Sequence, residues 1–170
     1  ACYASVWHWM DLVRPQTQAS QPQTLWLDLF GGMLIADPFG VFIKIFLYSF
    51  VFLTDVLTLL TRIPDREDSA DFYCLLLGST LGMSIMATAN HLLMVFIGIE
   101  MASLPSYAMA GFLKGKRQSS EAALKYVVYG GGAAGVMLYG MSLLAGKFGT
   151  GYLPDIGTGL AGVLTTAPLD

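Results

Sequence analysis

Four long apolar runs constrain the fold of this chain more than any other feature of its sequence. They span residues 37–60, 72–89, 91–112 and 121–145, and each is close to or above the roughly 20 helical residues that cross a bilayer core. Hydrophobic residues make up 55% of the chain and charged residues only 12%, about half the usual charged share. We therefore predict an all-α integral membrane protein, built as an antiparallel bundle of transmembrane helices.

The segments outside these runs are shorter or more polar. Residues 1–10 are apolar but too short to cross a bilayer, and we interpret them as the end of a further span. Residues 146–170 are rich in glycine and threonine and form the tail of a single membrane domain. The chain begins with Ala1 and stops shortly after an apolar run, so we expect it to be a piece of a longer polypeptide.

Several functions are excluded by what the sequence lacks. A net charge of −3 without a concentrated basic surface argues against nucleic acid as a partner. Cys2 and Cys74 cannot form a disulfide framework, and the sequence shows no metal-ligand spacing. The glycine-rich stretch 130–135 lies within a span and has no preceding strand, which favours helix packing over a phosphate site.

Glycine pairs spaced four residues apart predict close contacts between helices. Such pairs occur at Gly78 and Gly82 and again at Gly131 and Gly135. Small residues at this spacing let helix backbones approach each other in lipid. The alternative is that glycine is simply common in membrane helices; under either interpretation the helices pack as a bundle.

Basic residues predict the orientation of the bundle. Loops rich in Lys and Arg stay on the cytoplasmic side, or on the matrix side in an organelle. Two loops that fall on one side carry five basic residues, and the opposite side carries two. The five are Arg62, Arg66, Lys114, Lys116 and Arg117, and the two are Arg14 and Lys147.

Glu100 is the most informative charge within the predicted spans. It lies near the middle of the run 91–112, where a charge costs roughly 3 kcal/mol or more. Pro105 follows five residues later, removes a backbone hydrogen bond and is expected to kink the helix. A carboxyl group at this depth beside a helix irregularity indicates a proton or ion site. The alternative is a structural, protonated Glu that hydrogen-bonds between helices.

Lys125 is the second candidate, and its role stays open at this stage. It lies eight residues after Arg117, within reach of the membrane interior. Glu121 precedes it by four residues, the favourable order for an ion pair within a helix. Lys125 is therefore either part of a proton path with Glu121 nearby or an interfacial lysine paired with Glu121.

Three further ionisable residues are weaker candidates. Lys44 and Asp55 are eleven residues apart on one helix and therefore share nearly the same face, although both lie close enough to a helix end for an interfacial position. His91 stands at a helix start, where a capping role competes with a role as a proton relay.

Several of these residues belong to longer motifs. The motifs are Gly-Ile-Glu at 98–100, Ser-Leu-Pro at 103–105, Ala-Gly-Phe at 110–112 and Glu-Ala-Ala-Leu-Lys-Tyr at 121–126. In this order they closely resemble the antiporter-like membrane subunits of respiratory complex I, the NADH:quinone oxidoreductase. Within that family the N-type subunit, chain 2 in mitochondrial naming, is the most similar. The similarity extends over about residues 35–146.

The resemblance implies a function and a set of site residues. Glu100 and Lys125 would carry part of a proton path, with Lys44, His91 and Glu121 as secondary candidates. The chain would hold no redox centre, cofactor or metal of its own. NADH, flavin, iron–sulfur clusters and quinone would be bound by other subunits of the complex.

The resemblance also implies the surroundings of the chain. Its partners would be the lipid bilayer and other membrane subunits of complex I. We expect a bacterial inner membrane as its location rather than the mitochondrial inner membrane. The remaining residues of the family's proton path would lie beyond Asp170, so we do not expect this chain to pump protons by itself.

Two alternatives remain at this stage. A cation/proton antiporter subunit of the Mrp type shares the fold and the buried Glu and Lys. A purely structural membrane scaffold is the second, but it leaves the position of Glu100 unexplained.

Overall fold

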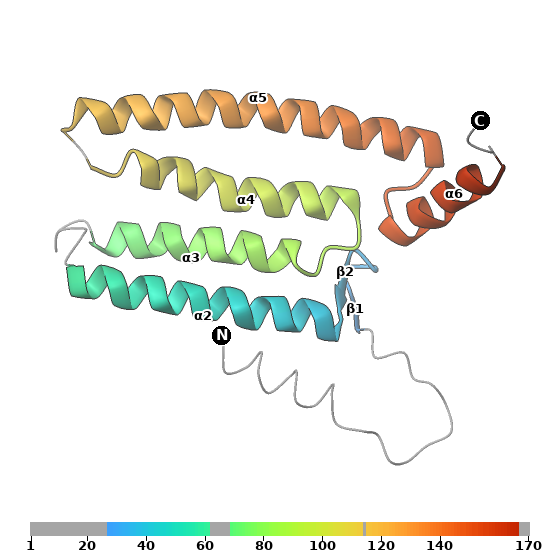
Figure 1. Ribbon diagram of the computed structural model, residues 1–170, viewed down its shortest axis with the longest axis horizontal. Helices are drawn as coiled ribbons and strands as arrows, with labels where there is room; N and C mark the ends of the chain where they lie inside the picture. The colour runs from blue at the N-terminus through green and yellow to red at the C-terminus, as the bar shows by residue number, and fades with distance from the viewer. Residues whose placement is uncertain (1–26, 62–68, 114, 167–170) are drawn as a thin grey trace, which may run out of the picture.

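The computed structural model describes residues 27–61, 69–113 and 115–166. In these ranges a short antiparallel hairpin of two strands precedes five helices. The strands are β1 (Leu27–Leu29) and β2 (Leu34–Ala36), and the helices are α2 (Pro38–Thr61), α3 (Ser69–Met86), α4 (Leu92–Ala110), α5 (Arg117–Phe148) and α6 (Leu153–Thr166). Figure 1 shows α2 to α5 side by side in chain order, with the hairpin and α6 at one end of the bundle.

Helices α2 to α5 are long and apolar enough to cross a membrane, at 24, 18, 19 and 32 residues. Helix α3 packs against α2 and α4, and α4 packs against α5, so neighbours in sequence are neighbours in space. The predicted all-α membrane class is confirmed. The predicted end of a span at residues 1–10 lies outside the described residues, as do Arg14, Arg62, Arg66 and Lys114.

The helices do not begin and end where the apolar runs do. Helix α3 starts three residues before the run 72–89, and α5 starts four residues before the run 121–145 and continues to Phe148. Hydropathy marks only the apolar part of a helix, whereas the hydrogen-bonded helix continues through polar residues at its ends. The tail 146–170 likewise contains a helix, α6, despite its glycine and threonine content.

The hairpin was not predicted, because strands of three residues are too short to show a periodic pattern. Its turn contains Phe30, Gly31 and Gly32, whose φ angles are 53°, 68° and 84°. Glycine adopts such positive φ angles without steric cost, and a Gly-Gly pair between short apolar stretches is a recognised hairpin signal.

Side chains and glycine define the helix ends at this side of the bundle. Asp37 precedes α2, and its carboxylate accepts a hydrogen bond from the backbone N–H of Gly40 at 2.8 Å. Pro38 occupies the first helical position, where its missing N–H costs nothing. Helix α5 ends at Gly149, which adopts the left-handed conformation with φ 69°.

Small residues bring α3 and α4 into close contact. A Cβ atom added to Gly82 would lie 2.5 Å from the backbone nitrogen of Ala102, and one added to Gly98 would lie 2.9 Å from the Cβ of Met86. The hydroxyl of Ser79 also donates to the carbonyl of Ala102 at 3.0 Å. This interface follows the close-packing pattern of membrane helices.

The prediction for the second glycine pair was wrong for the described helices. Nothing lies within 4 Å of a Cβ built on Gly131 or Gly135, so neither residue is at an interface in this part of the structure. Their neighbour Gly130 is the glycine of α5 that contacts α4, because the Tyr107 hydroxyl and ring occupy the space where its Cβ would lie.

Polar side chains lie inside the bundle, while large apolar side chains face outward. Phe46, Phe52 and Leu60 of α2 are all more than 60% exposed. Four polar residues of α3 and the turn after it are buried, namely Ser79, Thr80, Ser84 and Thr88. Their hydroxyl groups bond mostly to backbone carbonyls one turn earlier, which satisfies them without water. This arrangement suits a protein whose solvent is lipid.

The orientation of the bundle leads to a first testable prediction. Ser69 and Gln118 begin α3 and α5, and Figure 1 places the starts of these two helices at the same end of the bundle. In a Cys2→Ser, Cys74→Ser background, single cysteines at Ser69 and Gln118 should react with a membrane-impermeant thiol reagent from the cytoplasmic side only. Labelling of either position from the outer side would contradict the orientation.

Candidate functional site

Glu100 lies at a cavity between α4 and α5. The cavity has a volume of about 290 Å³. From α4 it is lined by Ile99, Glu100, Ser103 and Tyr107, and from α5 by Gly130, Ala133, Ala134 and Met137. Residues 100, 103 and 107 are spaced three and four apart, which places them on one face of a helix. The small residues opposite them on α5 leave the space open.

The carboxylate of Glu100 makes no hydrogen bond or ion pair with any residue that the structure describes. The serine of the cavity wall is engaged with its own helix. The Ser103 hydroxyl donates to the carbonyl of Ile99 at 2.7 Å. A carboxyl group that lines a cavity without a protein partner is free to exchange a proton with water or with a neighbouring side chain.

A polar and aromatic cluster continues from this cavity toward the loop between α4 and α5. The rings of Tyr107 and Tyr126 stack edge to face, with their centroids 4.7 Å apart. The Ser106 hydroxyl lies 2.6 Å from the carbonyl of Ser103 and 3.4 Å from the hydroxyl of Tyr126. Tyr126 directly follows Lys125 on α5, so this cluster connects the helix turn of Lys125 with the face of α4 that carries Glu100.

The structure resolves the open question about the pairing of Lys125. Its ammonium group donates to the Glu121 carboxylate at 2.6 Å, and the two side chains are 66% and 55% exposed. Exposed pairs of this kind contribute little stability. Lys125 makes no hydrogen bond or ion pair with Glu100, and neither Lys125 nor Glu121 lines the Glu100 cavity.

His91 and Lys44 lie away from the cavity. His91 is the N-cap of α4, where its Nδ1 accepts a hydrogen bond from the backbone N–H of Leu93 at 3.1 Å. Its ring stacks edge to face on Tyr152, with centroids 4.9 Å apart. Lys44 is partly buried on α2, and Asp37 at the start of that helix acts on it electrostatically. The structure therefore brings neither residue to Glu100.

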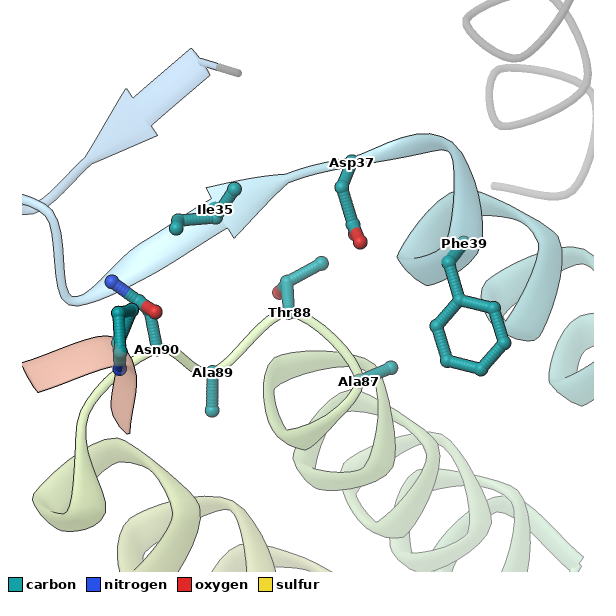
Figure 2. Close-up of a pocket in the computed structure, with 8 residues that line it drawn as sticks. Ile35, Asp37, Phe39, Ala87, Thr88, Ala89 and Asn90 are labelled. Atoms are coloured by element: carbon teal, nitrogen blue, oxygen red, sulfur yellow. The ribbon is translucent and has the colours of Figure 1, made fainter. Parts of the chain in front are cut away.

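A larger cavity, of about 500 Å³, lies at the end of the bundle that carries the hairpin. Figure 2 shows its wall, formed by β2, the start of α2 and the turn after α3. The polar groups here are already engaged, since Asp37 caps α2 and the Asn90 amide donates to the carbonyl of Gly32 at 2.9 Å. We therefore assign a structural role to the side chains around this cavity, because their hydrogen bonds join the hairpin to the helices.

Sequence reasoning missed the residues that surround Glu100. Ser103 and Tyr107 follow it by three and seven positions, which is the spacing of a common helix face, so this signal was available. Gly130 and Tyr126 lie on α5, and only the packing of α5 against α4 brings them close. No group of His, Cys, Asp and Glu able to hold a metal ion occurs within the described ranges.

Comparison with known proteins identifies the family. Residues 89–167 match the family model described as NADH:quinone oxidoreductase/Mrp antiporter, transmembrane. The match begins just before α4 and therefore includes both walls of the Glu100 cavity.

Several similar bacterial proteins are named as subunits N or N 2 of NADH-quinone oxidoreductase. NADH-quinone oxidoreductase subunit N of Anaeromyxobacter sp. (strain Fw109-5) is 45% identical over 132 residues, which is 78% of this chain and 26% of that protein. Subunit N 2 of Chloroherpeton thalassium is 41% identical over 125 residues, which is 72% of this chain and 24% of that protein. Subunit N 2 of Symbiobacterium thermophilum is 37% identical over 164 residues, which is 91% of this chain and 30% of that protein.

The chain thus spans between a quarter and a third of the length of these relatives. The chain belongs to the antiporter-like membrane subunits of NADH:quinone oxidoreductase and Mrp antiporters, and its relatives in that family are subunits N.

Proposed function

We propose that this chain forms part of a proton-translocating membrane subunit of an NADH:quinone oxidoreductase. The observation that carries the proposal is the Glu100 carboxylate, which lines the α4–α5 cavity without a partner among the described residues. A protonatable group in an interhelical cavity of a membrane protein is typical of a proton path. The similarity to subunits N from several bacteria supports the same function.

In this proposal Glu100 holds and releases the proton. Tyr107 and Tyr126 extend the polar surface from the cavity toward the loop that precedes α5. Lys125, paired with Glu121, supplies a positive charge at that end. Lys44 and His91 are secondary candidates, because they lie away from the cavity and would join a path only through water or through other parts of the protein.

The chain itself would carry out no redox chemistry. NADH, flavin, iron–sulfur clusters and quinone would bind to other subunits of the complex, and its remaining membrane subunits would be the partners of this chain. A multi-pass position in a bacterial inner membrane fits the four apolar helices and the bacterial relatives.

A second candidate is a cation/proton antiporter subunit of the Mrp type. The matching family model includes both classes, which is the observation in its favour. The relatives are subunits N, which favours the oxidoreductase.

Affinity purification from bacterial membranes separates the two candidates. We expect the tagged protein to co-purify with flavin and iron–sulfur proteins and with NADH oxidation activity. Recovery with membrane partners alone, without flavin, iron–sulfur centres or NADH oxidation, would contradict the first proposal and favour the Mrp type.

A further inference from the structure

A second carboxyl group lies within the bundle, at the opposite interface from Glu100. Asp55 lines a cavity of about 300 Å³ between α2 and α3. Its Oδ1 atom is buried and has no hydrogen-bond partner among the residues that the structure describes. A buried carboxylate oxygen without a partner is costly, because it has lost its water and gained nothing in exchange. Such an atom indicates a ligand that satisfies it.

The rest of the cavity wall supplies polar groups in a line. Tyr48 precedes Asp55 by seven residues, which places it on the same face of α2 about 10 Å away along the axis. Thr80 and Ser84 of α3 face the same cavity and are buried. The Ser84 hydroxyl lies 3.0 Å from the Tyr48 hydroxyl, so these two groups form a polar pair across the interface.

These hydroxyl groups retain the capacity to bind a further polar molecule. The Thr80 hydroxyl donates its proton to the carbonyl of Leu76 at 2.7 Å and keeps its oxygen lone pairs as acceptors. The Ser84 hydroxyl has one proton, which the Tyr48 hydroxyl at 3.0 Å and the carbonyl of Thr80 at 2.9 Å share, and the Tyr48 hydroxyl keeps at least one lone pair as an acceptor. The cavity therefore offers acceptor oxygens along its length, with Asp55 at one end.

Among simple ligands, water fits this site best. Within the described ranges no basic side chain lines the cavity, so none of these residues offers the carboxylate a cationic partner there. A water molecule requires two to four polar partners and occupies about 30 Å³ in the liquid, so the cavity has room for several. Asp55 and Tyr48 are about 10 Å apart along α2, which is more than one water molecule spans. Thr80 lies one turn before Ser84 on α3, and the contacts Tyr48–Ser84 and Thr58–Tyr73 place that turn on the Asp55 side of Ser84.

We propose that Asp55, Thr80 and the Tyr48–Ser84 pair form a hydrated site, in which a short line of water molecules joins the Asp55 carboxyl group to the two hydroxyls. This site gives the bundle a second carboxyl group in contact with water. Helices α3 and α4 separate it from the cavity that Glu100 lines. It goes beyond the proposed function, because it does not depend on which complex the protein joins.

X-ray radiolytic labelling tests this proposal, since radicals formed from bound water oxidise the side chains beside it. With the full chain in lipid nanodiscs and isotope-labelled water, we expect oxidation of Tyr48 and Leu77, which line the cavity. Val136 of α5, which is 75% exposed on the outer surface of the bundle, serves as the lipid-facing reference. Labelling of Tyr48 and Leu77 no greater than that of Val136 would overturn the proposal.

Two substitutions test the role of Asp55 itself. Asp55→Leu, which removes the polar end of the line, should lower labelling of Leu77 several-fold, whereas Asp55→Asn should preserve it because the amide still binds water. Unchanged labelling of Tyr152, at the hairpin end of the bundle, would show that both variants keep the fold. Labelling of Leu77 that is as strong in Asp55→Leu as in the unaltered chain would overturn the assignment of the water to Asp55.

Discussion

Gly82→Ala is expected to destabilise the bundle by roughly 1–3 kcal/mol. The added Cβ would lie 2.5 Å from the backbone nitrogen of Ala102 and 2.9 Å from the carbonyl oxygen of Gly98. Both contacts are with backbone atoms, which cannot rotate away as a side chain does, so α3 and α4 must separate. The midpoint of thermal unfolding in nanodiscs measures the loss.

Gly131→Ala is the matched control for this prediction. It adds the same methyl group to a helix at a position where nothing lies within 4 Å. Alanine has the higher helix propensity, by about 1 kcal/mol, so this variant should unfold at the same temperature or slightly higher. An equal loss of stability in the two variants would show that close approach of α3 and α4 is not the cause.

Glu100→Ala is expected to lower the rate of proton translocation by the assembled complex to less than about a tenth of the unaltered rate. A positioned proton-transfer group contributes a factor of at least that size to a rate. Lys125→Ala should retain most of the activity, and Lys125→Arg nearly all of it. Lys125 lies outside the Glu100 cavity and is paired with Glu121 on an exposed helix face, so it acts on the carboxyl group only at a distance. Proton uptake by vesicles during NADH oxidation measures all three variants.

The relative order of these effects is the test. A larger loss in Lys125→Ala than in Glu100→Ala would contradict the assignment of roles. The control is Glu121→Gln, which removes the partner of Lys125 without touching the cavity and should behave like Lys125→Ala.

The sequence was sufficient to predict the class of fold and to mark Glu100 as the leading candidate for a site residue. Long apolar runs mark membrane helices because the bilayer fixes their length, and a carboxyl group within such a run is rare enough to stand out. The i to i+4 spacing of Glu121 and Lys125 likewise suggested the ion pair that the structure contains.

Other features depended on packing between helices, which the sequence does not encode locally. Uniformly apolar helices show no preferred face, so the spacing at Gly131 and Gly135 looked the same as that at Gly82. Only the arrangement of α4 and α5 shows that Gly130 meets Tyr107 while Gly131 meets nothing. The buried oxygen of Asp55 could not be foreseen either, because its position near a helix end suggested the interface.

The number of protons moved per NADH oxidised in the Glu100→Gln variant tests the central proposal most directly. Glutamine keeps the shape of the side chain and its place in the cavity but cannot carry a proton. We expect this ratio to fall while assembly and NADH oxidation persist. An unchanged ratio in a correctly assembled complex would remove Glu100 from the proton path.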